Sequence, residues 1–385
     1  MNTLLLGVGA VGSVIARHLA SHRGITMLTL CDRDTHRAER LAREMDARRV
    51  RVTPLDAGDP GALARAFRGQ GLVINAVLPR FNAAVMDAAL EAGCQYIDLA
   101  SGEDDQFARH AAWRSVGRTA LHGMGEDPGI SNVLARLGAD RLDEVETIRV
   151  RDGEFSEGED LPLACLFSSE TFIEEAVSPA RFYEDGVWKE VPAWSNREVY
   201  PFPSPVGPQT IYSMSHEEVD TLPRFIGKGV RKVDFKLAVP DAMQRDLAFL
   251  DRIGMTRRDD VAVGGVRVRP ISVLAAVLPQ PADLGGRVRG AAIVLVEVDG
   301  VRHGNRVRHT FHAAMTHEEA FRRQGTTATA FLTGSGGAAG AIAIATGRVT
   351  TPGVLAPEQL DPAPMIALLA ELGVTVEEST RVLTD

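Results

Sequence analysis

TLLLGVGAVGSVIARHLASHRGITMLTLCDR, residues 3–33, is the stretch of sequence that decides the fold. A short apolar strand leads into the glycine pattern at residues 7–12, a helix follows over about residues 11–21, and a second strand ends at Asp32. Strand, glycine-rich turn, helix and strand in this order are typical of a βαβ unit that binds a dinucleotide. The stretch therefore predicts a cofactor-binding domain at the start of the chain.

Each glycine of the turn has a separate mechanical task. Gly7 makes the tight turn, Gly9 lets the backbone approach a pyrophosphate, and Gly12 lets the helix pack on the strand. The pyrophosphate would lie at the N-terminus of the helix, beside Ala10 and Val11, where free N–H groups and the helix dipole attract anions. A Rossmann domain that has lost its ligand is the alternative interpretation of the same pattern.

The choice of cofactor depends on Asp32 and Arg33. Asp32 lies 20 residues beyond Gly12, at the tip of the second strand, where an acidic side chain meets the adenosine ribose hydroxyls. A carboxylate there repels a 2′-phosphate and therefore favours NAD. Arg33 could instead stack on the adenine or pair with that phosphate, so NADP stays open as the alternative.

Length and composition describe a globular chain with room for two domains. Of 385 residues, 45% are hydrophobic and 24% are charged, and the net charge is −9. This balance argues against a nucleic-acid partner, because phosphate recognition needs a clustered basic surface. We find no run of about 18 apolar residues, and the first residues already form a strand rather than a leader. We therefore expect a cytoplasmic protein with a small-molecule substrate and no membrane partner.

Cysteine and histidine patterns favour neither a disulfide nor a metal. Cys31, Cys94 and Cys165 are far apart and odd in number, which favours reduced, buried thiols. Two His-Glu-Glu triplets occur, at residues 216–218 and 317–319, but neither extends to the HExxH pattern of a zinc site. We therefore predict no bound metal.

The alternation of helices and strands continues after Asp32. A charged helix is predicted over about residues 35–47, and a strand over residues 50–56 ends at Asp56. Ligands of open parallel sheets bind beyond the carboxyl ends of the strands, so Asp56 is a candidate adenine contact. A turn or helix-capping role before Asp59-Pro60 is the alternative for this aspartate.

Three further strands complete the predicted sheet. They cover residues 72–77, 95–99 and 119–122, and helices are predicted over residues 60–69, 83–91 and up to Val116. Six strands with intervening helices predict a doubly wound parallel sheet of the Rossmann type, in the α/β class. Strands four to six would open over the nicotinamide half of the crevice.

The pattern changes at GMGEDPGISN, residues 123–132, where a proline and three glycines break the alternation. Beyond this point, several stretches alternate apolar with polar residues, as antiparallel strands with one solvated face do. These stretches are residues 145–150, 230–239, 266–269 and 291–298. They predict a second, α+β domain with a mostly antiparallel sheet. Within it, the proline-rich residues 200–208 predict a long extended loop.

The sequence becomes helical again from about Gly325. Residues 333–340 are rich in glycine and alanine but lack the Gly-Lys-Ser/Thr of a P-loop, so close packing of a helix against other backbone explains them better. We expect this tail to return to the first domain. The predicted domains are a dinucleotide-binding domain of residues 1–129 and 325–385, discontinuous in sequence, and a substrate-binding and dimerisation domain of residues 130–324.

Several motifs, taken together in order and spacing, are shared with a known family. They are GVGAVG at 7–12, LDAGDP at 55–60, VINAVLP at 73–79, AGCQYIDLA at 92–100, GEDPGISN at 125–132, Ser215-His216-Glu217, and GRVTTPGVLAPEQL at 347–360. On these motifs the chain resembles the saccharopine dehydrogenase family, including its lysine 6-dehydrogenase branch, over essentially its whole length. Residues 97–101 depart from the serine-rich stretch of saccharopine reductases and are closer to the lysine-dehydrogenase and carboxynorspermidine-type pattern.

The resemblance implies NAD(P)-dependent oxidoreduction at a carbon–nitrogen bond of an amino acid, with lysine or a lysine-derived secondary amine as substrate. It also implies a set of cofactor contacts along the carboxyl edge of the sheet. These are Gly7 to Gly12 for the pyrophosphate, Asp32 and Arg33 for the adenosine ribose, Asp56 and Ala57 for the adenine side, and Val77, Leu78, Pro79, Asp98 and Leu99 along the nicotinamide ribose.

Two residues are candidates for the chemistry at the substrate. Hydride transfer needs the substrate carbon close to nicotinamide C4 and an amine that has lost its proton. Asp127, which matches a substrate contact in the family, could attract and align an ammonium group, and His216 could take its proton. Asp127 also suits a turn former before Pro128, and His216 also suits a hydrogen-bonded structural histidine.

We therefore expect an NAD(P)-dependent amino-acid dehydrogenase that forms a homodimer through the sheet of its second domain. An imine reductase that works in the synthetic direction on another amine, with a carboxynorspermidine-like or opine product, is the alternative among enzymes. A noncatalytic protein that binds NAD(H) as a redox sensor is the alternative from another class.

Overall fold

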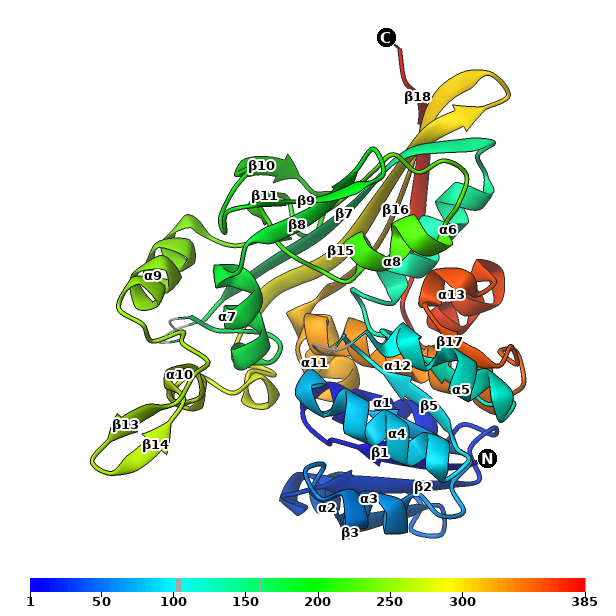
Figure 1. Ribbon diagram of the computed structural model, residues 1–385, viewed down its shortest axis with the longest axis vertical. Coiled ribbons are helices and arrows are strands. Elements are labelled where there is room, and N and C mark those ends of the chain that lie inside the picture. Colours follow the sequence, from blue (N-terminus) through cyan, green and yellow to red (C-terminus); the bar gives the residue numbers. More distant parts are fainter. Residues whose placement is uncertain (102–104, 159–160, 162, 385) are drawn as a thin grey trace. The chain divides into compact units, whose positions relative to one another are not determined.

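A computed structural model describes residues 1–101, 105–158, 161 and 163–384 of the chain (Figure 1). The chain divides into two compact units. The first unit contains Met1–Leu137 and Phe331–Val376, and the second contains Gly138–Ala330 and Glu377–Asp385.

These bounds correct the predicted domains at three places. The first break lies after residue 137 rather than 129, within helix α6 (Ile130–Asp140), and the return lies after residue 330 rather than 324. The last residues were assigned to the first domain but belong to the second unit. The physical reason is that β18 (Val376–Val382) adds an edge strand to the sheet of the second unit, next to β16 (Asn305–Thr316).

The first unit is built on a parallel sheet whose described strands number seven, in the order β17-β6-β5-β4-β1-β2-β3. The strands are β1 (Asn2–Leu6), β2 (Met27–Asp32), β3 (Val50–Pro54), β4 (Leu72–Asn75), β5 (Gln95–Asp98), β6 (Thr119–Leu121) and β17 (Gly353–Leu355). The doubly wound α/β prediction is confirmed. The sequence did not predict β17, which pairs in parallel with β6 and comes from the tail of the chain.

The crevice of the first unit follows from this strand order. The chain moves outward from β1 to β2 and β3, and then returns to the other side of β1 with β4. Ligands of doubly wound sheets bind at this switch point, beyond the carboxyl ends of the strands. The helices that connect or follow the strands are α1 (Ala10–Ala20), α2 (His36–Ala42), α3 (Pro60–Ala66), η1 (Pro79–Phe81), α4 (Asn82–Glu91), η2 (Gln106–Arg109), α5 (His110–Ser115), α12 (Ala328–Ala345), η4 (Pro357–Gln359) and α13 (Pro362–Glu371).

Helix α12 packs its small residues against the backbone of the first unit, as predicted. A Cβ added at Gly336 would lie 2.0 Å from the carbonyl oxygen of Gly125, and one added at Gly334 would lie 2.5 Å from Cβ of Val14. The prediction that the chain lacks an apolar run of membrane length was wrong for this helix. Its 18 residues are long and apolar enough to cross a membrane, but 89% of them are buried inside the protein, which packing explains.

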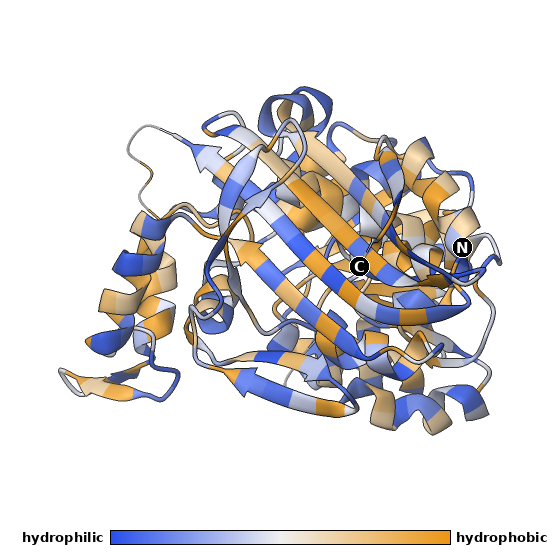
Figure 2. Cartoon of the chain, turned by 90° about the horizontal axis from the view of Figure 1, so that it is seen from above, coloured by the Kyte–Doolittle hydropathy of each residue, from blue (hydrophilic) through white to orange (hydrophobic). Residues whose placement is uncertain are grey.

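The second unit is built on a mixed sheet of nine described strands, with the path β10-β11-β12-β7-β15-β16-β18. Off this path, β8 pairs with β12, and β9 pairs with β8. Its remaining strands are β7 (Glu144–Glu157), β8 (Ala180–Glu184), β9 (Val187–Val191), β10 (Glu198–Pro201), β11 (Pro208–Ser213), β12 (Lys232–Ala238) and β15 (Arg289–Arg302). Hydrophilic and hydrophobic residues alternate along its long strands (Figure 2). The predicted antiparallel arrangement holds for most pairs, but β7 and β12 run parallel.

The proline-rich segment forms a hairpin rather than the predicted long loop. β10 and β11 pair from Glu198↔Ile211 to Pro201↔Pro208, which leaves residues 202–207 as the connection. Phe202 and Val206 in this connection are buried against Ile293 and other apolar residues of the sheet. Burial of these two side chains holds the connection on the sheet.

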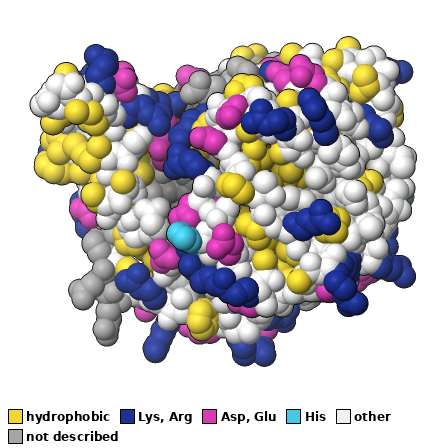
Figure 3. Space-filling model, turned by 90° about the horizontal axis from the view of Figure 1, so that it is seen from below, with side chains coloured by type: hydrophobic (Ala, Val, Ile, Leu, Met, Phe, Trp, Pro, Cys, Tyr) yellow, Lys and Arg dark blue, Asp and Glu magenta, His cyan; other side chains and the backbone are white. Residues whose placement is uncertain are grey.

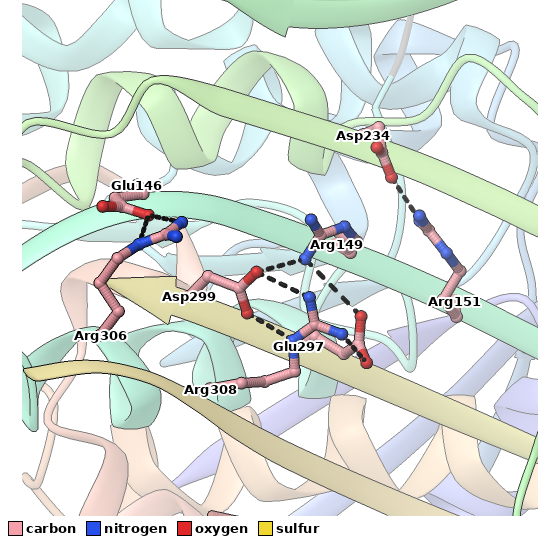
Figure 4. A network of polar contacts seen from close by, with 8 residues as sticks. All are labelled: Glu146, Arg149, Arg151, Asp234, Glu297, Asp299, Arg306 and Arg308. Atoms are coloured by element: carbon pink, nitrogen blue, oxygen red, sulfur yellow. Dashed lines mark hydrogen bonds and ion pairs between the residues drawn. The ribbon is translucent and has the colours of Figure 1, made fainter. Parts of the chain in front are cut away.

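Charged side chains link the central strands of the second sheet (Figure 4). Arg308 donates to Asp299 at 2.5 and 2.7 Å and to Glu297 at 2.9 Å, and Arg149 donates to Asp299 at 2.7 Å. Arg151 pairs with Asp234 on the neighbouring strand, and Arg306 pairs with Glu146. The network pairs the charges on residues 149, 297, 299 and 308, which lie on β7, β15 and β16.

Residues 266–269 were predicted as part of the second sheet but form a separate hairpin, β13 (Val261–Val263) with β14 (Val266–Val268). Acidic and basic side chains are interspersed on the face shown in Figure 3, and hydrophobic ones gather at its left. Val263 and Val266 of this hairpin are exposed, as is Val277, the last residue of α10 (Pro270–Val277).

The helices of the second unit are α7 (Ser169–Val177), α8 (Glu218–Phe225), α9 (Asp241–Arg252), α10 (Pro270–Val277), η3 (Pro281–Asp283) and α11 (His317–Gln324).

Candidate functional site

The glycine turn after β1 separates glycines that the fold requires from one that a ligand requires. Gly7 has φ +95°, and a Cβ there would lie 2.6 Å from the carbonyl oxygen of Ala76. A Cβ at Gly12 would lie 2.0 Å from the carbonyl oxygen of Gly7. A Cβ at Gly9 would meet no described heavy atom within 4 Å. The turn therefore keeps open space at Gly9, as close approach of a pyrophosphate needs.

The N-terminus of α1 is prepared for an anion. Gly9 is the residue that precedes the helix, it provides no side-chain cap, and the first turn contains no acidic residue. Ser13 N–H donates to the carbonyl oxygen of Gly9 at 3.1 Å, which is the first hydrogen bond of the helix. The N–H groups of Ala10, Val11 and Gly12 come before this bond in the chain, and they have no acceptor within the helix. Free N–H groups at a helix N-terminus bind phosphate.

Asp32 connects the tip of β2 to this turn. Val8 N–H donates to Oδ2 of Asp32 at 2.8 Å, and Asp34 N–H donates to Oδ1 at 3.2 Å. The Asp32 side chain is half-buried and Arg33 beside it is exposed. The sequence-based prediction places both residues at the adenosine ribose, and the Val8 contact adds a structural role for Asp32 that the sequence did not reveal.

Asp56 and Ala57 follow β3. Gly58 N–H donates to Oδ1 of Asp56 at 2.8 Å, so Asp56 has the turn role of the alternative interpretation. The cap of α3 is Asp59, which accepts from Ala62 N–H at 3.0 Å. Ala57 is buried in the core of the unit. An adenine contact by either residue stays a prediction.

Buried amides support the segments that follow β4 and β5. Asn75 at the end of β4 donates to Asn82 at 2.8 Å and to the Tyr96 hydroxyl at 3.1 Å. Asn82 donates in turn to the carbonyl oxygen of Ala100 at 2.6 Å. The predicted nicotinamide contacts Val77, Leu78, Pro79 and Leu99 lie in these two segments and are half-buried.

Asp98, another predicted cofactor contact, has a carboxylate that bonds within the first unit. Its side chain is 1% exposed, and its carboxylate accepts from Gly123 N–H at 2.7 Å and from Nδ1 of His122 at 2.8 and 3.0 Å. Its backbone oxygen accepts from Met124 N–H at 2.9 Å. The carboxylate thus bonds to the two residues that follow β6, and a contact of Asp98 with the nicotinamide ribose stays a prediction.

The sequence analysis missed the residues that Asp98 brings together. Nε2 of His122 lies 2.9 Å from Oγ of Ser101, so Ser101, His122 and Asp98 form a continuous line of hydrogen bonds. Asp98 ends β5 and His122 follows β6, and the two strands pair in parallel. An acid and a histidine at the carboxyl ends of adjacent predicted strands were the available signal.

Asp127 lies in the turn that follows β6. Gly125 N–H donates to the carbonyl oxygen of Pro128 at 2.7 Å across this turn, and the side chain of Asp127 is half-buried. A turn-forming role is therefore present, as the alternative interpretation required. Its role toward a substrate stays a prediction.

His216 belongs to the second unit and has three acidic neighbours. Nδ1 lies 2.5 Å from Oε2 of Glu218 and 3.2 Å from Oε2 of Glu217, and the ring stacks on Phe235 with centroids 4.0 Å apart. Burial acts to lower the pKa of His216, but Glu218 and Glu217, with Glu175, raise it to about 10. His216 is therefore protonated at neutral pH.

These contacts favour the structural interpretation of His216, and its role as a proton acceptor stays a prediction. A proton acceptor must be deprotonated before it acts, and an imidazolium with a pKa of about 10 is not. The hydrogen-bonded structural histidine of the alternative interpretation fits the contacts better. His216, Glu217 and Glu218 also place ligand atoms within 4.8 Å of one another, a spacing that a metal site also shows.

Comparisons with known proteins agree with the two-unit organisation. Residues 3–121 match the saccharopine dehydrogenase NADP binding domain, and residues 125–374 match the saccharopine dehydrogenase C-terminal domain. The fold is similar to apo saccharopine dehydrogenase (L-Glu forming) from Saccharomyces cerevisiae, with a TM-score of 0.77 and 17% identity over 99% of both chains. It is also similar to homospermidine synthase from Legionella pneumophila in complex with NAD, with a TM-score of 0.68 and 13% identity over 98% of this chain and 91% of that one.

Two characterised relatives are similar in sequence over nearly their whole length. Carboxyaminopropylagmatine dehydrogenase from Synechocystis sp. is 30% identical, covering 97% of this chain and 96% of the relative. Carboxynorspermidine synthase from Vibrio cholerae is 27% identical, covering 97% and 95%. The first unit binds NAD or NADP, which confirms the predicted cofactor class.

Proposed function

Because this chain belongs to the saccharopine dehydrogenase family, we propose that it reduces an imine formed between a cationic amine and a carboxylated aldehyde. Its product is then a secondary amine of the carboxynorspermidine or carboxyaminopropylagmatine kind. The observation that carries this proposal is the 30% identity to carboxyaminopropylagmatine dehydrogenase across 97% of the chain.

The proposed reaction joins two pieces through a carbon–nitrogen bond. The reduced nicotinamide supplies a hydride to the imine carbon, and the imine nitrogen gains a proton. In the first unit, the open space at Gly9 and the N-terminus of α1 would hold the pyrophosphate. Asp127, after β6, would attract a positively charged group of the substrate.

This order of candidates differs from the one that the motifs favoured. The sequence resemblance ranked lysine or saccharopine first as the substrate. The two relatives named above are instead named after carboxyaminopropylagmatine and carboxynorspermidine. Oxidation of lysine or saccharopine remains the second candidate, because the two matching domain families carry the saccharopine dehydrogenase name.

The test is a substrate comparison with the purified chain in the oxidative direction. Carboxyaminopropylagmatine, carboxynorspermidine, saccharopine and lysine are each mixed with NAD or NADP, and the absorbance of the reduced nicotinamide is followed. We expect turnover with one of the first two amines. Turnover only with saccharopine or lysine would select the second candidate. Cofactor binding by calorimetry without turnover of any amine would favour a noncatalytic NAD(H) sensor.

A further inference from the structure

Three side chains of the first unit form a hydrogen-bonded line from the interior to the carboxyl edge of its sheet. Asp98 and His122 are 1% and 3% exposed, whereas Ser101 is half-buried. The successive contacts are 2.8 Å from Asp98 to Nδ1 of His122 and 2.9 Å from Nε2 of His122 to Oγ of Ser101. We propose that Ser101, His122 and Asp98 form a proton relay for the substrate nitrogen, with the Ser101 hydroxyl as the group that contacts it.

The surroundings of Asp98 fix the direction of this line. Its Oδ1 accepts from Gly123 N–H at 2.7 Å, and both of its oxygens lie within 3.0 Å of Nδ1 of His122, so we infer that Nδ1 of a neutral His122 carries the hydrogen and donates to Asp98. Nε2 is then an acceptor for the hydroxyl hydrogen of Ser101. When His122 is protonated, Nε2–H donates to the Ser101 oxygen instead, and the hydroxyl hydrogen turns to another acceptor.

The fold holds the middle of the line and the backbone next to its outer end. The edge of the Phe107 ring packs against the His122 ring, with centroids 5.5 Å apart and planes at 81°. Asn82 donates to the carbonyl oxygen of Ala100 at 2.6 Å and so fixes the backbone directly before Ser101. A hydrogen-bonded group that is held from two sides needs little rearrangement to transfer a proton.

The position of the line identifies the group it serves. Asp98 and His122 follow β5 and β6, on the side of β1 opposite to β2, whose tip carries Asp32. In doubly wound sheets the adenosine lies over the β2 side and the nicotinamide over the other. Ser101 therefore lies in the half where hydride transfer occurs. This inference rests on the proposed function for the identity of the nitrogen.

The proton balance of the relay is complete in both directions. In reduction, hydride adds to the imine carbon and the nitrogen takes the Ser101 hydroxyl proton. Ser101 recovers a proton from Nε2–H of the His122 imidazolium, which becomes neutral while Asp98 stays ionised. Solvent then returns one proton to His122. In oxidation, the substrate carbon would give its hydride to the oxidised nicotinamide, and Ser101 receives a proton from the substrate amine while its own passes to Nε2. The His122 imidazolium then releases one proton to solvent.

The same three residue types form the catalytic set of serine hydrolases, in which the serine attacks a carbonyl. The dinucleotide turn beside this line favours proton transfer over acyl transfer. Hydrolysis of p-nitrophenyl acetate that requires Ser101, together with unchanged amine oxidation in Ser101→Ala, would overturn the relay.

A first experiment examines the line without any substrate. Protein with ¹⁵N-labelled histidine, saturated with NAD, is studied by NMR, with Ser101→Ala used to assign the His122 signals. We expect the neutral Nδ1–H form of His122, and in Ser101→Ala a shift of the Nε2 resonance while Nδ1 stays in place. In Asp98→Asn, the amide would donate to Nδ1 and leave the proton on Nε2. A neutral wild-type His122 with its proton on Nε2 would overturn the relay.

A second experiment measures oxidation of carboxyaminopropylagmatine or carboxynorspermidine, whichever the wild-type protein turns over. We expect Ser101→Ala, His122→Gln and Asp98→Asn each to lower kcat by about 100- to 10,000-fold. KM should change little, and NAD affinity by calorimetry and Tm should be maintained. Ser101→Thr keeps a hydroxyl at this position, so its kcat should be higher than that of Ser101→Ala.

The matched control is Ser335→Ala. Ser335 is buried in α12 of the same unit, and its Oγ lies 3.1 Å from Nε2 of His18, so the variant also removes a serine–histidine contact. It should keep its kcat. Equal losses in Ser335→Ala and Ser101→Ala would overturn the relay. Wild-type inactivity with every amine would refute the proposed function, and the NMR result would still decide the relay.

Discussion

Asp32 has two tasks at the tip of β2 that different substitutions separate. Its Oδ2 holds Val8 of the dinucleotide turn by a 2.8 Å hydrogen bond, while its charge is placed to select between ribose hydroxyls and a 2′-phosphate. Asparagine keeps an oxygen acceptor for Val8 N–H and removes the charge. Alanine removes both.

We predict that Asp32→Ala weakens NAD binding by about 10- to 150-fold, which corresponds to a charge-assisted hydrogen bond of about 1.5–3 kcal/mol. Asp32→Asn should lose the preference for NAD over NADP with less disturbance of the turn. Isothermal titration calorimetry with both cofactors measures this, with Arg40→Ala, at an exposed residue of α2, as the control. Unchanged NAD affinity in Asp32→Ala would show that the carboxylate does not contact the ribose.

Asp127 is tested by the isosteric change Asp127→Asn, which keeps the turn between Gly125 and Pro128 and removes the charge. If the carboxylate pairs with a substrate cation, kcat/KM should fall by about 10- to 150-fold. NAD binding and Tm should be maintained. Kinetics equal to wild type with the same amine would leave Asp127 with its turn-forming role alone.

The glycine turn at the start of α1 contains one glycine that is packed against backbone and one that faces open space. Gly12 is packed against the carbonyl of Gly7, whereas Gly9 faces open space. We therefore assign Gly12 to helix packing and Gly9 to the approach of the ligand, although the two glycines are three residues apart.

We therefore predict opposite effects of two alanine substitutions in this turn. Gly9→Ala should keep the Tm of the cofactor-free protein but weaken NAD and NADP binding, because its Cβ occupies the pyrophosphate space. Gly12→Ala should lower stability by about 1–3 kcal/mol or more, because its Cβ would lie 2.0 Å from the Gly7 oxygen. Thermal unfolding with and without NAD measures both. Equal stability losses in the two variants would contradict the assignment of Gly9 to the ligand.

At the scale of the whole molecule, buried charge makes stability depend on pH. Burial is the main cause that raises the pKa of Glu175 from 4.5 to about 8, and the acidic neighbours of His216 raise its pKa from 6.5 to about 10. The folded state thus binds more protons than the unfolded state, so stability falls as pH rises. The contribution of His216 is fully present below about pH 6.5 and is lost as pH rises through about 10.

We predict that Tm falls progressively between about pH 7 and pH 10, above the range in which histidines of lowered pKa such as His18 and His317 titrate. Glu175→Gln, which cannot ionise, should remove the part of this slope that extends to about pH 8. His36→Gln, at an exposed histidine, is the control and should follow the wild type. Differential scanning calorimetry across this range measures the slopes. If Tm depends on pH in Glu175→Gln as it does in the wild type, the raised pKa of Glu175 is contradicted.

The homodimer and the cytoplasmic location predicted from the sequence remain proposals. Sedimentation velocity of the full chain tests the first, and fractionation of the source cells tests the second.

The sequence by itself determined the βαβ start, the cofactor class and the α/β fold. Gly7, Gly9, Gly12 and Asp32 act within one continuous stretch, and local backbone geometry and the end of a strand suffice to define their roles. Apolar strands such as residues 72–75 are also recognisable, because burial on both faces of a parallel sheet leaves a continuous apolar run.

Only the tertiary structure decided which residues Asp98, Ser101, His122 and His216 contact. Asp98 and His122 are 24 residues apart and meet because β5 and β6 pair in parallel and end at the same edge. The protonation of His216 follows from the carboxylates that the fold gathers around it, including Glu175 from another helix. Sequence patterns describe neighbours along the chain, whereas charge and hydrogen bonding depend on neighbours in space.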